Sequence, residues 1–323
     1  MSVKDDVLTC LEQNRGKNVS GGALAARIGV SRNAVFKAVC ALKDLGYGIE
    51  SSRGGYTLPE SDNALSVPSI AKYLRGKKYN IHLYNEVTST NAVIKEMAEN
   101  GAPEWTIAVA EHQTAGRGRQ GRAFVSPDKT GIYTSVLLRP DIPLTRTTLI
   151  TVAAAVAAAR AIERNTEGGV GIKWVNDIYK SGRKVCGILT EASFDAEISK
   201  LSYAVLGVGI NVAPPRGGFG GDVDGIAGAI AETATAELRS KIIADFYDEF
   251  SYFYENGLEL SIDEYRKRQL LIGKKAEMSR GGETFVVDVM DVDENCALVV
   301  RRADGTVEKI TSGEVSAHVI AGE

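Results

Sequence analysis

Three arginines and three glycines alternate within residues 111–122, which read EHQTAGRGRQGR. The guanidinium groups of Arg117, Arg119 and Arg122 are planar and permanently charged, and they match the oxygens of carboxylates and phosphates. The glycines let backbone amides approach a ligand closely. Because neighbouring guanidinium groups repel one another unless an anion lies among them, the segment predicts an anion-binding loop. Taken alone, it also fits a solvated basic surface loop.

Other residues that could do chemistry lie downstream and upstream of this loop. Lys173, Asn176 and Asp177 fall close together among apolar neighbours in residues 171–179. Lys184 begins an apolar segment, where it is either a solvated gatekeeper or a charge directed into a site. Residues 88–91 read TSTN, and their hydroxyl groups suit the N-cap of a helix but could also bind a small polar ligand group.

An α/β domain has to position these residues. Apolar runs predict strands near 80–87, 105–110, 131–139, 184–191 and 201–211. Helical spacing predicts helices at 91–100, 144–162, 233–256 and 261–270. The most apolar run, 149–162, contains Arg160 and is too short to span a membrane, so a buried helix is expected. Residues 213–225, rich in glycine and proline, predict a functional loop without regular structure.

The N-terminal segment has the pattern of a winged helix-turn-helix. Helices are predicted at 3–14, from Ser20 to Arg27 and from Ser31 to Leu45, and a hairpin follows around residues 52–55. The basic and polar residues in this segment predict DNA binding; a solvated helix face or a protein-docking module is the alternative. The expected DNA-binding residues are Ser31, Arg32, Asn33, Lys37 and, at the tip of the wing, Arg53.

The composition limits the classes of function. With 323 residues and a net charge of −3, the chain can contact nucleic acid only through a local basic patch. Its four cysteines and three histidines are scattered, which disfavours a zinc site or a disulfide framework and fits a reducing cytoplasm. No signal peptide is expected. From residue 274 onward, strands predicted at 275–278, 284–292, 297–301 and 306–311 indicate a small SH3-like β-barrel.

Six motifs occur together and in order: TSTN (88–91), QTAGRGRQGR (113–122), KWVND (173–177), KVCGIL (184–189), GVGIN (207–211) and SGEVS (312–316). With a winged helix before them and a small barrel after them, the chain resembles the bifunctional biotin protein ligases, which are also biotin-operon repressors. The resemblance covers nearly the whole length. It implies a winged helix-turn-helix at 1–63, an α+β class II synthetase-like ligase domain at 64–271 and an SH3-like barrel at 272–323.

The resemblance also implies a two-step reaction. The carboxylate of biotin attacks the α-phosphate of Mg-ATP and gives biotinyl-5′-adenylate and pyrophosphate. A lysine of a biotin carboxyl carrier protein then takes the biotinyl group as an amide. Fixed cations suit this chemistry, because negative charge builds on the α-phosphate. The adenylate-bound form is further implied to dimerise and to place two winged helices on a palindromic operator.

The roles of single residues follow from the matching motifs. The implied catalytic residues are Lys184, Arg117, Arg119, Arg122 and Asp177, of which Asp177 either holds Mg²⁺ or orients the incoming amine. The implied biotin-binding residues are Ser89, Thr90, Asn91, Gln113, Gly116, Arg117, Arg119, Lys184, Gly187, Leu189 and Gly209. The implied contacts to ATP or the adenylate are Arg119, Arg122, Lys173, Asn176, Asn211 and Phe219. Loops 116–122 and 213–225 would shield the adenylate from water.

Two positions depart from the family pattern. Val175 stands where KWPND has proline, and residues 227–230 read AGAI in place of Ala-Thr-Ser-Leu, which leaves the adenine contacts less defined. Two other functions share the fold: a regulator that senses a small ligand without catalysis, and a lipoate ligase. Retention of Lys184, Asp177 and the loop arginines favours catalysis, and the loop together with the winged helix favours biotin. The same motifs disfavour an inactive structural module.

Overall fold

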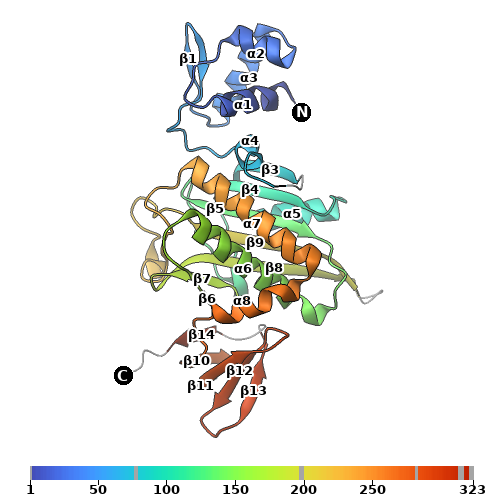
Figure 1. The fold of residues 1–323 in the computed structure, drawn as a ribbon, viewed down its shortest axis with the longest axis vertical. Coiled ribbons are helices and arrows are strands. Elements are labelled where there is room, and N and C mark those ends of the chain that lie inside the picture. Colours follow the sequence, from blue (N-terminus) through green and yellow to red (C-terminus); the bar gives the residue numbers. More distant parts are fainter. Residues whose placement is uncertain (1, 76–78, 196–199, 281–282, 312–315, 320–323) are drawn as a thin grey trace.

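The computed structural model describes residues 2–75, 79–195, 200–280, 283–311 and 316–319. Three units follow one another along its long axis (Figure 1): a small helical unit, a central sheet with helices, and a C-terminal sheet. This is the predicted architecture. The exact domain boundaries at 63/64 and 271/272 stay predictions.

The N-terminal unit contains three helices, α1(Val3–Gln13), α2(Gly21–Ile28) and α3(Arg32–Asp44). A serine precedes each helix, and its hydroxyl accepts a hydrogen bond from a backbone amide of the first turn, as expected for an N-cap. The helices enclose a separate apolar core, whose most buried members include Val7, Leu11, Leu24, Val35, Val39 and Leu42. The sequence prediction of a helix-turn-helix is confirmed.

The wing consists of β1(Glu50–Ser52) and β2(Gly55–Thr57), which pair in antiparallel register with Arg53 and Gly54 in the turn. Gly55 has φ of 143°, and a Cβ atom on it would lie 2.1 Å from the carbonyl oxygen of Val19. A larger residue would therefore separate the wing from the segment that precedes α2, where Val19 bridges to Tyr56. This close approach fixes the wing against the helices.

The central sheet has seven strands in the order β3-β4-β5-β9-β8-β7-β6, in which only β3 and β4 run parallel. Its strands are β3(Asn80–Val87), β4(Thr106–Gln113), β5(Gly131–Leu138), β6(Gly171–Lys173), β7(Asp177–Lys180), β8(Arg183–Asp195) and β9(Lys200–Asn211). The short strands β6 and β7 were not predicted, because three or four residues are too few to show an apolar period. They form a hairpin on which Lys173 and Asp177 lie opposite each other.

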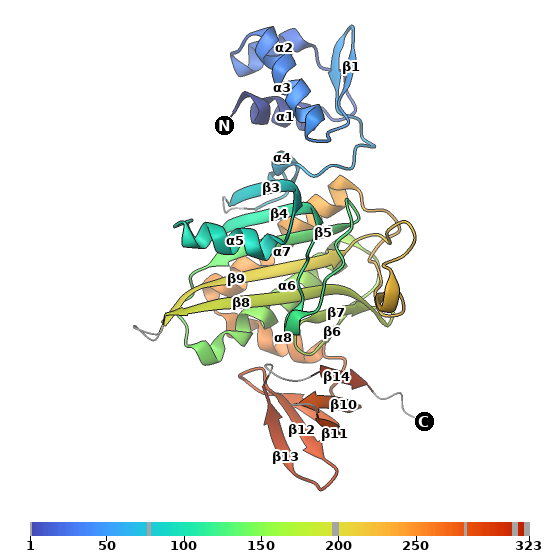
Figure 2. The same cartoon turned by 180° about the vertical axis from the view of Figure 1, so that it is seen from behind.

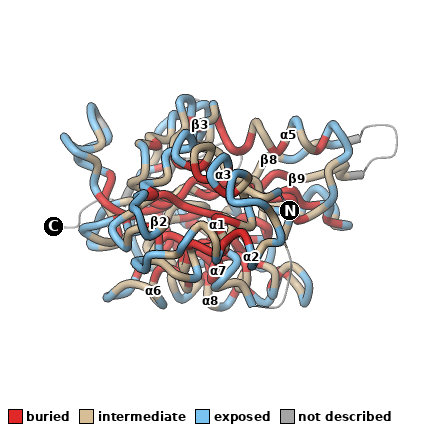
Figure 3. The backbone as a smooth tube through the Cα atoms, turned by 90° about the horizontal axis from the view of Figure 1, so that it is seen from above, coloured by how far each residue is buried: buried red, intermediate tan, exposed pale blue. Residues whose placement is uncertain are grey.

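Helices cover the two faces of this sheet unequally. One face packs against α6(Thr148–Asn165), α7(Ala236–Asn256) and α8(Ile262–Lys267), whereas α5(Thr90–Glu99) covers part of the other (Figures 1 and 2). Buried residues gather between these layers when the molecule is viewed from above (Figure 3). The remaining elements are α4(Val67–Ala71) and the short 3-10 helices η1(Arg119–Gly121), η2(Leu144–Arg146), η3(Gly221–Val223) and η4(Leu258–Ser261).

Helix α6 is buried, as predicted, because its alanines let it lie close to the sheet and to α7. The apolar run at 149–162, which we expected to be too short to span a membrane, lies within a longer helical segment. Helix α6 and η2 together form the segment Leu144–Asn165, which has 22 residues and a mean hydropathy of 1.2 in its most apolar window. By length and composition it could cross a membrane, but 72% of that window is buried inside the fold. The helix begins at 148 rather than 144, since residues 144–146 form the 3-10 turn.

Two other helix predictions need shorter bounds. Helix α7 begins at Ala236 because the hydroxyl of Thr235 caps it by accepting from the amide of Leu238. Helix α8 ends at Lys267, after which Gln269 bridges to Ile172 of β6. The loop at 213–225 is irregular as predicted, apart from η3, and Gly217, Gly218 and Gly220 all adopt φ between 83° and 88°.

The C-terminal unit is a five-stranded antiparallel sheet in the order β13-β12-β11-β10-β14. Its strands are β10(Lys275–Arg280), β11(Glu283–Val292), β12(Leu298–Arg302), β13(Val307–Ile310) and β14(Ser316–Val319). Four were predicted, whereas β14 was not. The motif SGEVS (312–316) lies outside the described residues except for Ser316.

A buried ion pair between Arg239 and Glu111 binds the segment around residues 63–65, which joins the first two units. Arg239 of α7 is fully buried and donates to the carboxylate of Glu111 in β4, while another of its nitrogens donates to the carbonyl of Asn63. The amide of Leu65 donates to the same carboxylate at 2.6 Å. On the side of the winged helix, the hydroxyl of Tyr47 donates to the carbonyl of Leu65 at 3.0 Å.

Substitution Glu111→Gln should destabilise the central unit, because it leaves the buried guanidinium of Arg239 without a countercharge. We expect the free energy of unfolding to fall by about 3 kcal/mol or more. Urea unfolding followed by fluorescence measures this, since both tryptophans, Trp105 and Trp174, are buried in the central unit. The control Glu237→Gln breaks an exposed pair with Lys241 on the same helix and should cost less than about 1 kcal/mol. Equal losses of unfolding free energy in the two variants would contradict the stabilising role of the buried pair between Glu111 and Arg239.

Candidate active site

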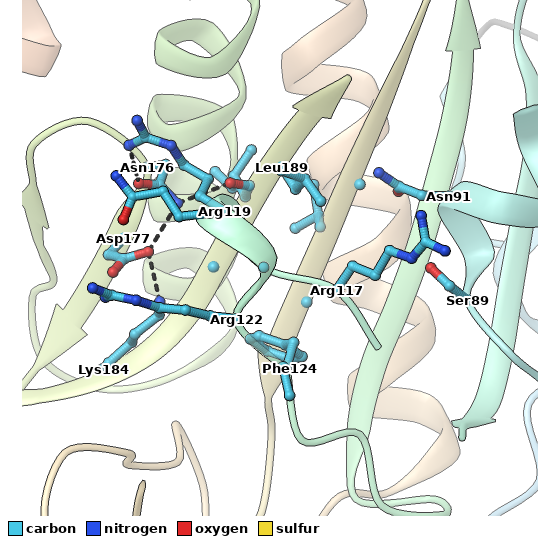
Figure 4. Close-up of a pocket in the computed structure, with 18 of the residues that line it drawn as sticks. Ser89, Asn91, Arg117, Arg119, Arg122, Phe124, Asn176, Asp177, Lys184 and Leu189 are labelled. Atoms are coloured by element: carbon cyan, nitrogen blue, oxygen red, sulfur yellow. Dashed lines mark hydrogen bonds and ion pairs between the residues drawn. The ribbon is translucent and has the colours of Figure 1, made fainter. Parts of the chain in front are cut away.

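A cavity of about 290 Å³ lies on the face of the sheet that carries α5. It is enclosed by residues 116–122, which we call the Arg-Gly loop, by the start of α5, by the β6–β7 hairpin and by strands β8 and β9 (Figure 4). The predicted residues that line it are Ser89, Thr90, Asn91, Gln113, Arg117, Arg119, Arg122, Lys173, Asn176, Asp177, Lys184, Gly187, Leu189 and Gly209. Residues from five of the six motifs therefore meet in one place.

Alternation along β8 and β9 makes room for this cavity. Cys186, Ile188, Val208 and Ile210 belong to the core on the α6 side, whereas the glycines between them face the cavity. A Cβ on Gly209 would lie 2.5 Å from the ring of Phe124, and one on Gly207 would lie 2.1 Å from the side-chain oxygen of Asn91. The floor therefore requires glycine, because larger residues would displace the side chains that surround the cavity.

One end of the cavity is cationic. The ammonium of Lys184 lies 2.7 Å from Asp177, whose carboxylate also accepts from the side-chain amide of Asn176 at 3.0 Å. Arg119 donates in turn to the side-chain oxygen of Asn176 at 3.1 Å. The backbone of Lys184 is fixed as well, since its amide donates to the carbonyl of Ile226 at 2.8 Å. Figure 4 shows Arg122 beside Asp177 and Lys184.

Positive charge exceeds negative charge at this end. Among the described residues that line this end, Arg119, Arg122, Lys173 and Lys184 accompany a single carboxylate, that of Asp177. Burial lowers the pKa of Arg119, and the charge of Asp177 only partly opposes this. Burial likewise lowers the pKa of Lys173, with the neighbouring charges of Lys184 and Arg122 adding to the effect. An anionic ligand would relieve both the crowding and the desolvation.

The other end of the cavity is neutral and polar. The amide of Thr90 donates to the side-chain oxygen of Gln113 at 2.9 Å, and the hydroxyl oxygen of Thr90 lies 3.2 Å from the same oxygen. Gln113 donates from its nitrogen to Ser126 at 2.8 Å. Arg117 extends toward this end, near Ser89 and Asn91, rather than toward Arg119 and Lys184 (Figure 4). The end offers both donors and acceptors, as a neutral group with N–H and C=O functions would require.

Of the two roles that the sequence left open for the hydroxyls of TSTN, capping does not apply to Ser89. Ser89 is the N-cap residue of α5, but within the described part of the chain its hydroxyl makes no capping bond. The amide of Thr90, which lies in the first turn, donates instead to Gln113. Ser89 is buried and lines the cavity, so its hydroxyl is available to a ligand.

Three predicted contact residues are not among the described residues that line the cavity. Gly116 lies behind it: a Cβ there would be 2.3 Å from the carbonyl oxygen of Phe124, so the glycine lets the Arg-Gly loop fold back on itself. Asn211 is buried at the end of β9, and its carbonyl accepts from the amide of Ile230 at 3.1 Å. Phe219 lies in the 213–225 loop and is half-buried.

Several lining residues were not predicted from the sequence. These are Gly118, Gln120, Ala123, Phe124, Trp174, Tyr179, Ile188, Gly207, Val208, Val223 and Ile226. Some lie inside the quoted motifs, where their proximity to charged residues was a usable signal. Phe124 and Ile226 gave no such signal, because only the folded chain brings them next to β8 and β9.

The predicted DNA-binding residues lie on one unit and are accessible. Ser31, Arg32, Asn33 and Lys37 are exposed at the start of α3, and Arg53 is exposed at the tip of the wing. Arg32 packs against α2, since a Cβ on Gly22 would lie 2.9 Å from its guanidinium. Phe36, which the sequence analysis did not single out, is 55% exposed between Arg32 and Lys37.

Comparisons with known proteins agree with this arrangement. A helix-turn-helix domain matches residues 4–57, the biotin/lipoate A/B protein ligase family matches 84–211, and the C-terminal domain of biotin protein ligases matches 271–317. The bifunctional ligase/repressor BirA of Bacillus subtilis is 32% identical over 97% of this chain and 98% of its own length. The chain belongs to the biotin protein ligase family, in its bifunctional branch.

Two further comparisons support the assignment to this family. BirA of Escherichia coli is 27% identical over 93% of this chain and 93% of its own length. The biotin protein ligase of Aquifex aeolicus, solved with biotin and ATP, is 25% identical, covers 75% of this chain and 99% of its own length, and superposes with a TM-score of 0.61. The Aquifex aeolicus protein shares the fold of the part of this chain that it covers.

Proposed function

We propose that the cavity binds biotin and ATP side by side, forms biotinyl-5′-adenylate and transfers biotin to a lysine of a biotin carboxyl carrier protein. The cavity's two unlike ends carry this proposal. One end gathers cations around a single carboxylate, which suits the carboxylate of biotin and the phosphates of ATP. The other end presents neutral donors and acceptors that suit the urea ring of biotin.

In the first step, a carboxylate oxygen of biotin forms a bond to the α-phosphorus of ATP, and the bond from that phosphorus to the bridging oxygen breaks. Pyrophosphate leaves with the bonding electrons. The two reacting groups are both anionic, so they approach only where fixed cations offset their repulsion. Lys184, Arg119 and Arg122 would supply these charges, and Arg117 would contact biotin at the other end.

Asp177 limits where the Lys184 ammonium can lie. The 2.7 Å contact holds that ammonium at the junction of the β6–β7 hairpin and β8. A Mg²⁺ ion that arrives with ATP needs few protein ligands, because it usually keeps waters and phosphate oxygens. Asp177 fits such a role as a single carboxylate, and no group of three or more metal-binding side chains occurs among the described residues. The ion would neutralise phosphate charge.

In the second step, the lysine nitrogen of the carrier attacks the carbonyl carbon of the adenylate. The bond from that carbon to the phosphate oxygen breaks, AMP leaves, and the amine loses its proton. Water would destroy the same anhydride, so the cavity has to be covered. The Arg-Gly loop and the loop at 213–225 would form the cover. Val223 and Ile226 are exposed and line the cavity together with Lys173 and Asn176, on the side where the adenine would bind. Asn211 and Phe219 would add contacts to the adenine.

The second proposed activity is biotin-dependent repression. The winged helix would bind operator DNA through Ser31, Arg32, Asn33 and Lys37 in the major groove and through Arg53 at the wing. One winged helix per chain suits a homodimer on a palindromic operator, formed when the adenylate is bound. Both activities place the protein in the cytoplasm, away from any membrane.

Pyrophosphate release in the presence of Mg-ATP tests the ligase function. We expect stoichiometric release with biotin, turnover once a carrier domain is added, and no release with lipoate or octanoate. Release with lipoate would favour a lipoate ligase. If none of the three acids causes pyrophosphate release but DNA binding depends on biotin, the protein is a sensor without catalysis.

Substitution Lys184→Met should lower the rate of adenylate formation by about 100-fold to 1,000-fold, because it removes a fixed cation from the reacting phosphate. Rapid-quench measurement of radiolabelled adenylate reports this rate directly. Lys275→Met, on the exposed face of the C-terminal sheet, should react like the wild type. An unchanged rate in the Lys184 variant would remove that residue from the site.

Substitution Lys37→Ala should weaken operator binding by about tenfold or more, because the side chain is exposed on the recognition helix. The measurement is fluorescence anisotropy with a duplex selected from random sequences in the presence of biotin and Mg-ATP. Lys275→Ala is the matched control. If both variants bind equally well, the DNA contact lies elsewhere.

A further inference from the structure

A chain of hydrogen-bonded side chains runs behind the polar end of the cavity and includes residues outside every predicted site. It begins at the surface, where Lys95 of α5 lies 2.5 Å from one oxygen of Glu191 in β8. The other oxygen of Glu191 accepts from the side-chain nitrogen of Asn91 at 2.7 Å. The side-chain oxygen of Asn91 lies 2.6 Å from the hydroxyl of Ser135, which is fully buried in β5.

The chain continues to the residues that face the ligand. The hydroxyl of Ser135 also lies 2.7 Å from that of Thr90. Thr90 contacts the side-chain oxygen of Gln113 through its amide and its hydroxyl, and Gln113 donates to Ser126. Four of these residues, Thr90, Asn91, Ser135 and Ser126, are more than 95% buried, so bulk water cannot replace their partners.

Glu191 determines the direction of these bonds. A carboxylate only accepts hydrogen bonds, so Asn91 must present its nitrogen to Glu191 and its oxygen to Ser135. Burial would raise the pKa of Glu191, but the hydrogen bonds from Lys95 and Asn91 and the charges of Lys95 and Arg117 outweigh it and lower that pKa. The group is therefore ionised at neutral pH.

The single proton of Ser135 is then committed to Asn91. One proton cannot also serve the 2.7 Å contact between the hydroxyls of Ser135 and Thr90. Because the side-chain oxygen of Asn91 cannot donate, that second contact requires Thr90 as the donor. Gln113 keeps the bond from the amide of Thr90, at 2.9 Å, and retains one free lone pair on its oxygen. Thr90 likewise retains lone pairs on its hydroxyl oxygen. Both acceptors belong to residues that line the cavity.

We infer that Glu191, held by Lys95, is a positioning residue that orients the hydrogen bonds at this end of the cavity and thereby selects a cyclic urea. The inference rests on the proposed function. A urea ring carries two N–H donors and one C=O acceptor, so it gains from the oriented acceptors of Thr90 and Gln113. A dithiolane ring, the head of lipoate, has no N–H group and gains nothing from them.

Substitution Glu191→Gln keeps the shape but removes this direction. A glutamine can donate as well as accept, so the Asn91 amide can rotate and release Ser135 to donate to Thr90. The hydroxyl of Thr90 then donates to Gln113 and occupies the acceptor that the urea needs. The structure already allows that contact, at 3.2 Å.

The test is calorimetric titration of the full chain with biotin and, separately, with Mg-ATP. For Glu191→Gln we expect the Kd for biotin to rise about tenfold, the loss of roughly one oriented hydrogen bond. The Kd for Mg-ATP, the melting temperature and kcat at saturating biotin should stay near the wild-type values, so that the defect appears in KM for biotin alone.

Variants of the lysine provide a second test and a rescue. Lys95→Met removes the countercharge and should weaken biotin binding in the same direction, whereas Lys95→Arg keeps it and should bind like the wild type. If Glu191→Gln fails to fold, this pair decides the question. Glu99→Gln, an exposed carboxylate on the same helix, is the matched control and should have no effect.

The outcomes separate this inference from the proposed function. A wild-type chain that does not bind biotin would contradict the ligase assignment itself. Wild-type binding with unchanged affinity in Glu191→Gln and Lys95→Met would overturn the positioning role. Parallel losses of biotin affinity, ATP affinity and melting temperature would overturn it as well, since they would show a general structural role.

Discussion

Repulsion among like charges in a partly buried cavity is the constraint on which this structure depends. Two cations 6 Å apart repel each other by about 3 kcal/mol at an effective dielectric constant of 20. Five cationic side chains line the cavity, with the carboxylate of Asp177 as the one anion among its described lining residues. The surrounding fold has to hold these groups together before any ligand offsets the repulsion, which requires a rigid frame.

The two faces of the central sheet have different roles in this frame. On one face, the buried alanines of α6 allow close packing of the helix against β8, and α7 and α8 cover it further. On the other face, Gly187, Gly207 and Gly209 leave an open floor where side chains would otherwise fill the space. Because residues along a strand alternate between faces, the same segments of β8 and β9 supply core on one side and cavity on the other.

The sequence allowed correct predictions where a local pattern of residues determines the structure. Serine caps, apolar periods and the Arg-Gly spacing predicted the winged helix, the long strands and the loop that lines the cavity. The short strands β6 and β7 were not predicted, because their formation depends on pairing, of β6 with β7 and of β7 with β8, rather than on their own composition. For the hydroxyls of TSTN the sequence left helix capping and ligand binding open, because only the fold brings Gln113 to the amide of Thr90 and leaves Ser89 without a capping bond.

Other residues of the site could not be found from one sequence. Ser135 is one of three hydroxyl-bearing residues, with Tyr133 and Thr134, in the otherwise apolar strand β5, and Glu191 looks like an ordinary charge near the end of β8. Their partners are 44 and 100 residues away in the chain. Long-range contacts of this kind have no signature in spacing or composition, so they become visible only when the strands are paired.

The two ends of the cavity use one arrangement twice. At the cationic end, Asp177 pairs with Lys184 and accepts from Asn176. At the polar end, Glu191 pairs with Lys95 and accepts from Asn91. In each case the carboxylate forces the asparagine to turn its nitrogen inward and its oxygen toward another donor, Arg119 or Ser135.

This repetition has a physical cause. An amide side chain has donor and acceptor atoms of nearly equal size, so packing alone cannot decide which way it points. An ionised carboxylate can only accept hydrogen bonds. A carboxylate with its lysine therefore converts an ambiguous amide into an oriented one. Both ends of a site for an anionic chain with a neutral head require that orientation, because each must present donors and acceptors in a fixed order.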